Sequence, residues 1–373
     1  MQTEFAKKLG VDIPLFAFTH CRDVVVEVSK AGGIGVLGAA GFSPEQLKQE
    51  MDWIDERIGN HIYGVDIVIP RKYEGKGEMD AEKLEAMLES MVPQGHRDFA
   101  EKLLTDHGVP PMPEGSEKFS LHFSEAQGSL QVDEILKHPK CRMVVNALGT
   151  PPIPVVKRIH DSGRLVGALA GRLKHGISHK NAGLDFVVAL GCEGGGHTGT
   201  VASTVLWPQM VDALAPLPVI AAGGIASGRQ MLAAMSMGVA GVWLGSIWLL
   251  AEESYNEPAQ KAAFIAATSE DTVQSTSWTG KTARMLRNDW TEAWARSDTP
   301  DPLPMPLQSI VTADAAVRTH KYANSGECQK VSFNAVGQVV GQMHREESCR
   351  DIVYRLLKEY DDAFEHLKTI MPG

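Results

Sequence analysis

The chain has no run of basic residues, and its 373 residues carry a formal net charge of −10. Proteins that bind nucleic acid of any sequence need lysines and arginines to neutralise phosphates, so no nucleic-acid partner is expected. Cysteine is also scarce: Cys21, Cys141, Cys192, Cys328 and Cys349 are widely spaced and never form a CxxC pair. An odd number of scattered cysteines indicates free thiols in a reducing compartment, which predicts a cytoplasmic protein without a disulfide framework.

Several motifs of common enzyme chemistry are missing from the sequence. There is no HExxH, no spacing of two histidines and a carboxylate typical of an iron site, no P-loop and no GxSxG. Metal-dependent hydrolysis, ATP chemistry and α/β-hydrolase chemistry therefore have no local support, and no metal site is expected.

One uncharged stretch, residues 231–251, is long enough to cross a bilayer. Gly238, Gly241 and Gly245 interrupt it, which favours a helix over 227–237 followed by a buried strand over 241–249. The N-terminal residues lack the apolar core of a signal peptide. Contact with a membrane is therefore not expected.

Short apolar runs recur eight times along the chain, mostly rich in Val, Ile, Leu and Ala and without polar alternation, as in strands covered on both faces. They cover residues 13–19, 33–40, 64–69, 141–148, 164–171, 184–192, 217–225 and 241–249. Helical patterns separate them; Ser43, for example, begins one as an N-cap, with Pro44 next and Gln46 placed for a capping box. Eight strand-then-helix units predict an α/β fold, a closed (β/α)8 barrel.

Two regions exceed the minimal barrel repeat. Residues 71–140, after the third strand, contain helical patterns at 80–90 and 97–107 and form either a lid or substrate wall or a packed surface insertion. Residues 252–373 follow the eighth strand and end in a helix over 346–368. We expect a barrel over 1–295 that includes the insertion, and a C-terminal extension over 296–373 packed on it.

Residues 33–38, Gly-Ile-Gly-Val-Leu-Gly, match the GxGxxG pattern of dinucleotide-binding sites. That site requires the glycines between a strand and the following helix. Here they follow a helical pattern and lead into the second strand, so we interpret them as a helix end and a tightly packed strand.

The ends of the seventh and eighth strands are rich in glycine. Gly223 and Gly224 end the seventh strand, and Trp243, Leu244, Gly245 and Ser246 end the eighth. Barrel enzymes often bind phosphate at these two positions through backbone N–H groups and a helix N-terminus. The sequence favours a phosphate site here over plain tight turns.

The sixth strand ends in residues 191–197, Gly-Cys-Glu-Gly-Gly-Gly-His. A flat ring could lie against the backbone of Gly195 and Gly196, and His197 could transfer a proton near neutral pH. Glu193 could orient the loop by accepting N–H bonds, or act as a second acid or base at the substrate. His20, at the end of the first strand, is a second candidate active-site group, or a cap of the next helix.

Taken in order, several segments make the chain similar to the nitronate monooxygenase family, which in turn resembles FMN-dependent enoyl-thioester reductases. The segments are residues 28–38, 64–70, 193–199, 218–225, 241–246 and 279–288. The resemblance implies FMN lying without a covalent bond across the barrel mouth, in contact with Gly195. It further implies a flavin lined by Ala17, Phe18 and Thr19, a phosphate held by Gly224 and residues 243–246, and His197 as the catalytic histidine.

The chain departs from the family pattern at three places. The family's Ala-Pro-Met at the end of the first strand is here Ala17-Phe18-Thr19, its third-strand Asn is Asp66, and its Gln before the glycine loop is Leu190. Asp66 would therefore place a negative charge near the flavin ring and disfavour the anionic reduced flavin.

The function expected from these features is FMN-dependent oxidation of an activated carbon acid, an alkyl nitronate, by O2, with His197 as the base. One alternative is a flavin-dependent NAD(P)H reductase or dehydrogenase of an enoyl or acyl thioester, with His197 as proton donor. Another, from a different class, is a phosphate-binding barrel without redox chemistry. The sequence leaves open the choice between O2 and NAD(P)H, and whether the chain forms a homo-oligomer.

Overall fold

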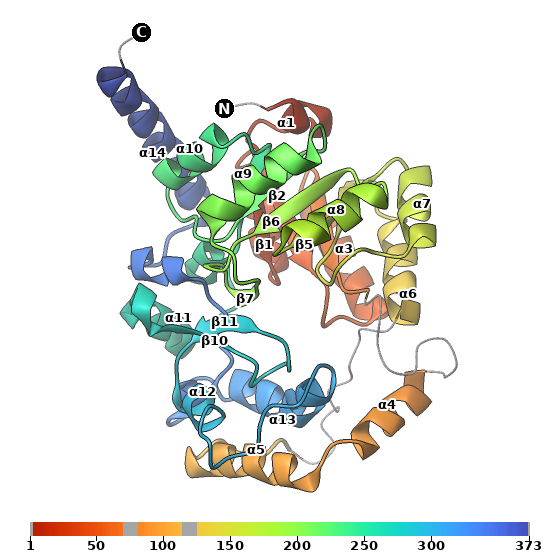
Figure 1. Ribbon diagram of the computed structural model, residues 1–373, viewed down its shortest axis with the longest axis vertical. Helices are drawn as coiled ribbons and strands as arrows, with labels where there is room; N and C mark the ends of the chain where they lie inside the picture. Colours follow the sequence, from red (N-terminus) through yellow and green to blue (C-terminus); the bar gives the residue numbers. More distant parts are fainter. Residues whose placement is uncertain (1–2, 70–80, 114–124, 372–373) are drawn as a thin grey trace.

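The computed structural model describes residues 3–69, 81–113 and 125–371. Its centre is a closed barrel of eight parallel strands, so the expected (β/α)8 fold is confirmed (Figure 1). In barrel order the strands are β1 (Leu15–Thr19), β2 (Ile34–Gly38), β3 (Tyr63–Ile67), β4 (Cys141–Asn146), β5 (Leu165–Ala170), β6 (Phe186–Leu190), β8 (Val219–Ala222) and β9 (Gly241–Leu244).

Seven of the eight predicted apolar runs contain one of these strands, and the run 64–69 overlaps β3, which begins one residue earlier, at Tyr63. The last prediction was too long. We expected a strand over 241–249, whereas β9 ends at Leu244 and a 3-10 helix, η1 (Ser246–Leu250), follows. The side chains of Ile247, Trp248 and Leu250 are buried in that helix. An uncharged apolar run predicts burial, and it does not distinguish a strand from a buried helical turn.

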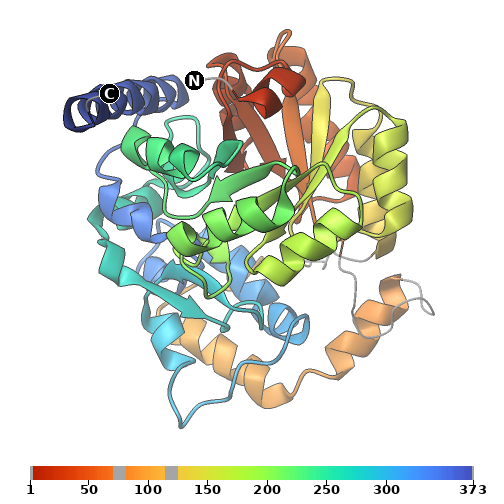
Figure 2. The ribbon, with the colours of Figure 1, turned by 45° about the horizontal axis from the view of Figure 1, so that its top comes forward.

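Helices form the outer layer of the barrel. They are α2 (Arg22–Lys30), α3 (Pro44–Arg57), α6 (Glu125–Ile135), α7 (Ile153–Asp161), α8 (Leu173–Asn181), α9 (Ser203–Leu214) and α10 (Gly228–Ser236). The terminal helix α14 (Cys349–Ile370) packs against α10 and α2, and Figure 2 shows it in dark blue at the edge of the barrel. The capping box expected at Ser43 is present, with Gln46 N donating to Ser43 Oγ at 3.2 Å and Ser43 N to Gln46 Oε1 at 2.9 Å.

The N-terminal end of the barrel is closed by the short helix α1 (Glu4–Leu9). The ring of Phe5 lies 6.1 Å from that of Phe16 and 5.3 Å from that of Phe186, both of which belong to the hydrophobic cluster inside the barrel. The opposite end, where the strands finish, carries the glycine-rich loops. Ligands of barrel enzymes bind at this C-terminal end, and we call it the mouth.

A second hydrophobic cluster lies beside the barrel. Helices α4 (Ala81–Ser90) and α5 (Gln94–Asp106), the hairpin of β10 (Thr272–Ser275) and β11 (Ala283–Leu286), α12 (Asp289–Ala293) and α13 (Leu307–Lys321) contribute to it. Both views show the orange insertion helices beside the cyan and blue segments (Figures 1 and 2). Residues on both sides of position 295 contribute to this cluster. The division into a barrel over 1–295 and an extension over 296–373 stays a prediction.

The helices predicted at 80–90, 97–107 and 346–368 correspond to α4, α5 and α14, although residue 80 itself lies outside the described residues. The segment 231–251 is divided as expected, between α10 and β9. In the described part of the chain, no helix combines the length and the apolar character needed to cross a membrane.

Candidate active site

The glycine loop, residues 191–199, runs out of the barrel and joins a small sheet. Its strand β7 (Gly196–His197) pairs antiparallel with β11, and β11 pairs with β10. Side chains of the hairpin hold both ends of the loop: Arg284 Nε donates to Cys192 O at 2.9 Å, and Gln274 Nε2 donates to Gly199 O at 3.0 Å. A loop rich in glycine is thus fixed by residues about 80 positions further along the chain.

His197 is oriented by the turn of the same hairpin. Its Nε2 lies 2.8 Å from Thr279 Oγ1, and Thr279 Oγ1 donates to Lys281 O at 3.0 Å. A hydroxyl has one proton, so Thr279 accepts from His197, which places the imidazole proton on Nε2 and leaves a lone pair on Nδ1. Burial, together with the positive charge of Lys281, lowers the pKa of His197 to about 4. The imidazole is therefore neutral at pH 7 and able to accept a proton.

Glu193 is engaged in holding the loop. Both of its carboxylate oxygens accept from Ser203 N, at 3.0 and 3.1 Å, and Ser203 Oγ donates to the same group at 2.9 Å. Ser203 is the first residue of α9, where the helix dipole favours a negative charge. Cys192 beside it stays a thiol, because burial and the Glu193 charge raise its pKa. This geometry fits a loop-orienting role for Glu193 and gives no support for a thiolate nucleophile.

Asp66 lies in β3 with its side chain inside the barrel. It lies on the same face of the strand as Gly64, which packs against Met143 of the interior cluster. Val65 and Ile67 point the other way and belong to a cluster under the helices of the outer layer. Asp66 is 2% exposed, and its Oδ2 has no hydrogen-bond partner among the described residues.

Burial raises the pKa of Asp66 well above its usual range. An isolated buried carboxylate costs much more free energy than the neutral acid. Burial therefore favours the neutral acid at Asp66, whereas the sequence predicted a negative charge at this position.

The end of β1 presents Phe18 and His20 at the mouth. His20 Nδ1 lies 2.8 Å from Gly38 O, so it donates there, and burial lowers the pKa of His20 although its side chain keeps accessible surface. This combination is expected of a group that lines a cleft. The ring of Phe18 lies 5.2 Å from that of His20 and 6.0 Å from that of Trp243, stacked on the latter.

Three other predicted site residues face away from the mouth or have local partners. The side chains of Ala17 and Leu244 are buried in a further hydrophobic cluster, between the barrel and its helices, so only their backbone atoms are available to a ligand. Thr19 Oγ1 accepts from Cys21 N at 3.0 Å and stabilises the start of α2.

The predicted phosphate loops lie at the ends of β8 and β9. Gly223 and Gly224 have φ angles of 91° and 73°, a conformation that side-chain-bearing residues rarely adopt. A Cβ on Gly223 would also lie 2.9 Å from Gly191 O in the glycine loop. At the end of β9, Ser246 Oγ accepts from Gly337 N at 2.8 Å. These loops bring exposed backbone to one side of the mouth.

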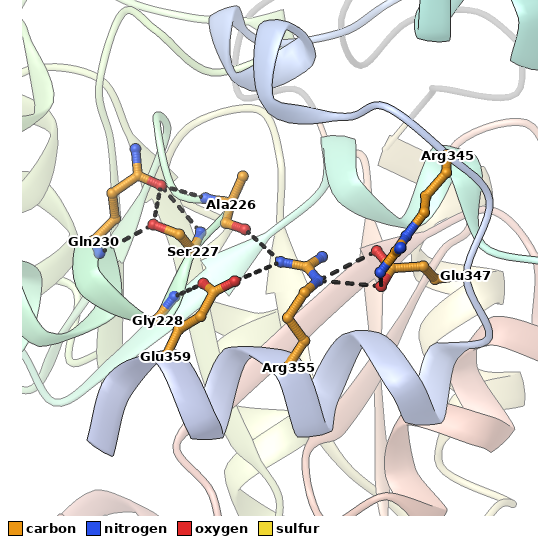
Figure 3. Close-up of polar contacts among 8 residues, drawn as sticks. All are labelled: Ala226, Ser227, Gly228, Gln230, Arg345, Glu347, Arg355 and Glu359. Carbon is orange, nitrogen blue, oxygen red and sulfur yellow. Dashed lines mark hydrogen bonds and ion pairs between the residues drawn. The ribbon is translucent and has the colours of Figure 1, made fainter. Parts of the chain in front are cut away.

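The start of α10, which a phosphate was expected to use, is occupied by the chain itself (Figure 3). Ser227 and Gln230 form a capping box, and Gly228 N donates to Glu359 Oε2 of α14 at 2.8 Å. Arg355, also from α14, bonds Glu359 at 3.3 Å and Ala226 O at 3.4 Å. A phosphate at the mouth would therefore rely on Gly224 and the loop after β9.

One segment at the mouth was missed in the sequence. Gln338 N donates to Glu193 O at 2.9 Å, and a Cβ on Gly195 would lie 2.7 Å from the carbonyl carbon of Val336. Together with the bond from Gly337 to Ser246, this places residues 336–338 between the glycine loop and β9. The signal available was Gly337-Gln338, a glycine in an irregular stretch far from any predicted strand.

The chain matches the family model described as nitronate monooxygenase over residues 18–359. It is 44% identical to the "Putative monooxygenase" of Mycobacterium tuberculosis over 100% of both chains. It is also 30% identical to the "Probable nitronate monooxygenase" of Staphylococcus aureus (strain MSSA476), over 84% of this chain and 85% of that one.

Two solved structures share the fold. The nitroalkane oxidase of Streptomyces ansochromogenes has a TM-score of 0.78 at 21% identity, covering 97% of this chain and 99% of that one. FabK from Thermotoga maritima has a TM-score of 0.74 at 22% identity, covering both chains fully.

Replacing Asp66 by Asn tests its protonation state. A raised pKa means that the folded chain binds a proton that the unfolded chain has released, so its contribution to stability falls as pH rises above about 4. Asp66→Asn abolishes that fall. Between the pKa of Asp66 in the unfolded chain and its raised pKa in the folded chain, the free energy of unfolding of the variant should grow relative to wild type by about 1.4 kcal/mol per pH unit. Urea unfolding at pH 4.5 and pH 8 measures this, with the exposed Asp161→Asn as control. A constant difference between the two pH values would show that Asp66 is ionised.

Replacing Thr279 by Val tests the tautomer of His197. In wild type, ¹⁵N NMR of labelled histidine should show His197 neutral at pH 5.5 with its proton on Nε2, whereas ordinary histidines titrate near 6.5. Thr279→Val removes the acceptor, so signals of both tautomers should appear. Thr198→Val, which alters a neighbour bonded to Gln274, is the control. An unchanged tautomer in Thr279→Val would remove Thr279 from this role.

Proposed function

The chain belongs to the nitronate monooxygenase family of oxidoreductases, and from that membership we propose that it oxidises alkyl nitronates with O2 by means of bound FMN. The observation that carries the proposal is His197, a neutral imidazole whose Nδ1 has no hydrogen-bond partner among the described residues and whose position is fixed directly after three glycines. This is the state a proton acceptor needs at neutral pH.

The residues at the mouth fit a flavin mononucleotide. Gly196 offers open backbone for the face of a ring, and Gly195, whose Cβ side packs against Val336 and Gly337, would contact the ring with its other face. Phe18, His20 and the backbone of Ala17 and Thr19 would line the ring from the end of β1. The loops at Gly223–Gly224 and Trp243–Ser246 offer backbone N–H groups for the phosphate. When bound, FMN supplies the redox chemistry by taking up electrons that O2 then removes.

Asp66 completes this fit. Its buried carboxyl group lacks a partner in the described part of the chain. A neutral carboxylic acid presents one donor and one acceptor side by side, as the amide of Asn does. In this neutral form Asp66 would hydrogen-bond to the flavin or the substrate, as an Asn at this position could, without adding charge to the reduced flavin.

His197 would exchange a proton with the substrate, and Lys281 would stabilise its negative charge. Nδ1 of His197 would remove the proton from the carbon beside the nitro group of a nitroalkane, or hold the nitronate that has already lost it. The charge of Lys281 favours the negative nitronate oxygens and, because it lowers the pKa of His197, also favours release of the proton afterwards.

Replacing His197 by Asn tests the proposal. Purified wild type should be yellow with the absorption of oxidised flavin, and acid treatment should release FMN into solution. His197→Asn should bind FMN within about threefold of the wild-type Kd, because the loop backbone is unchanged. Its turnover of ethyl nitronate should fall by about 10²-fold or more, in the range that general acid–base catalysis supplies.

Two results would contradict the proposal in different ways. A colourless protein without saturable FMN binding would favour a barrel without redox chemistry. Full activity of His197→Asn with FMN bound would leave the FMN part of the proposal standing and show that His197 has no role in the reaction. His138→Asn, at a histidine buried between Asp55 and Glu134 on the helical layer, is the matched control and should keep full turnover.

A further inference from the structure

Four basic side chains gather on one side of the mouth. Arg172, Lys174 and His175 lie at the start of α8, directly after β5, and Lys281 lies in the turn of the β10–β11 hairpin. We call these four residues the basic rim. All four have exposed side chains.

Contacts with the glycine loop bring the two halves of the basic rim close together, and Lys281 lies near enough to His175 to act on its charge. Gly171 precedes Arg172 and packs tightly on Gly199, because a Cβ on Gly199 would lie 2.3 Å from Gly171 O. From the other half, Lys281 follows two residues after Thr279, which binds His197. Both halves therefore adjoin the segment from His197 to Gly199.

Among the described residues, no carboxylate forms an ion pair with the basic rim. Of the ion pairs formed by residues 3–69, 81–113 and 125–371, none involves Arg172, Lys174 or Lys281. Surrounding protein lowers the pKa of Lys281, and no carboxylate offsets this. Burial and the three neighbouring cations lower the pKa of His175. Elsewhere several arginines pair with acids, as Arg158 does with Asp133 and Arg318 with Glu101.

The start of α8 adds to the positive potential. Its first turn has no acidic residue, and the side chain of its N-cap Arg172 makes no capping bond. Cations at this end of a helix oppose the helix dipole, which costs free energy unless an anion binds nearby. An anion bound near the start of α8 would offset that cost.

We propose that the basic rim binds an anionic oxygen group, a phosphate or a carboxylate, that the substrate carries at a distance from its reacting carbon. Guanidinium and ammonium groups recognise both kinds of anion through charge-assisted hydrogen bonds. The inference rests on the proposed function, because an anionic group bound at the basic rim would position the reacting carbon of the same molecule beside His197. It restricts the substrate to molecules with a charged handle.

Titration of FMN-loaded protein with small anions tests this inference, since bound FMN fills the flavin's own phosphate site. Inorganic phosphate and succinate are the two probes, and isothermal titration in a chloride buffer of matched ionic strength measures their binding. Wild type should bind at least one probe saturably. The double variant Arg172→Gln/Lys174→Gln and the single variant Lys281→Gln should each weaken that binding about tenfold or more.

Lys180→Gln is the matched control, since it removes the same charge from the other end of α8 and should leave the Kd within twofold. Binding of phosphate alone would define a phosphorylated substrate, and equal binding of succinate a carboxylated one. Absence of saturable binding by either probe, or equal weakening in Lys180→Gln, would overturn the proposal. The flavin absorbance of the same samples reports FMN binding separately, so failure of the proposed function is recognised independently.

Discussion

The pairing of two residues, Gly196 and His197, with the hairpin strand β11 determines the geometry of the whole site. Without it, a loop with three successive glycines would have no preferred conformation. The hairpin fixes the loop through Arg284 and Gln274 and orients the imidazole through Thr279. The barrel thus supplies the mouth, while a segment after the eighth strand supplies the rigidity.

The electrostatics of the mouth follow from the same packing. Burial lowers the pKa of His197 to about 4, lowers that of His20 and raises that of Asp66, so at all three groups it favours the uncharged form. The fixed positive charges lie at the edge, in the basic rim. This arrangement would let a negatively charged substrate approach the edge while the reacting atoms meet neutral donors and acceptors.

The sequence predicted the barrel because apolar runs report burial directly, and all eight strands lie where these runs are. It also located His197 and the glycine ends of β8 and β9, since strand ends converge at one end of a barrel. It failed where contacts join distant segments. The approach of Gly337 to the glycine loop, the bond of Glu359 to Gly228, and the position of Lys281 all depend on how residues after 250 fold back. The burial of Asp66, which favours the neutral acid over the expected charge, also depends on neighbours that the sequence pattern does not identify.

Anaerobic reduction of the FMN-loaded protein tests the central claim most directly. Ethyl nitronate and NAD(P)H are mixed separately with the protein in a stopped-flow instrument, and the loss of oxidised-flavin absorbance is followed. The account predicts rapid bleaching by ethyl nitronate, little by NADH or NADPH, and recovery of the absorbance when O2 is admitted. Rapid bleaching by NADH or NADPH, with none by the nitronate, would contradict it and indicate a reductase.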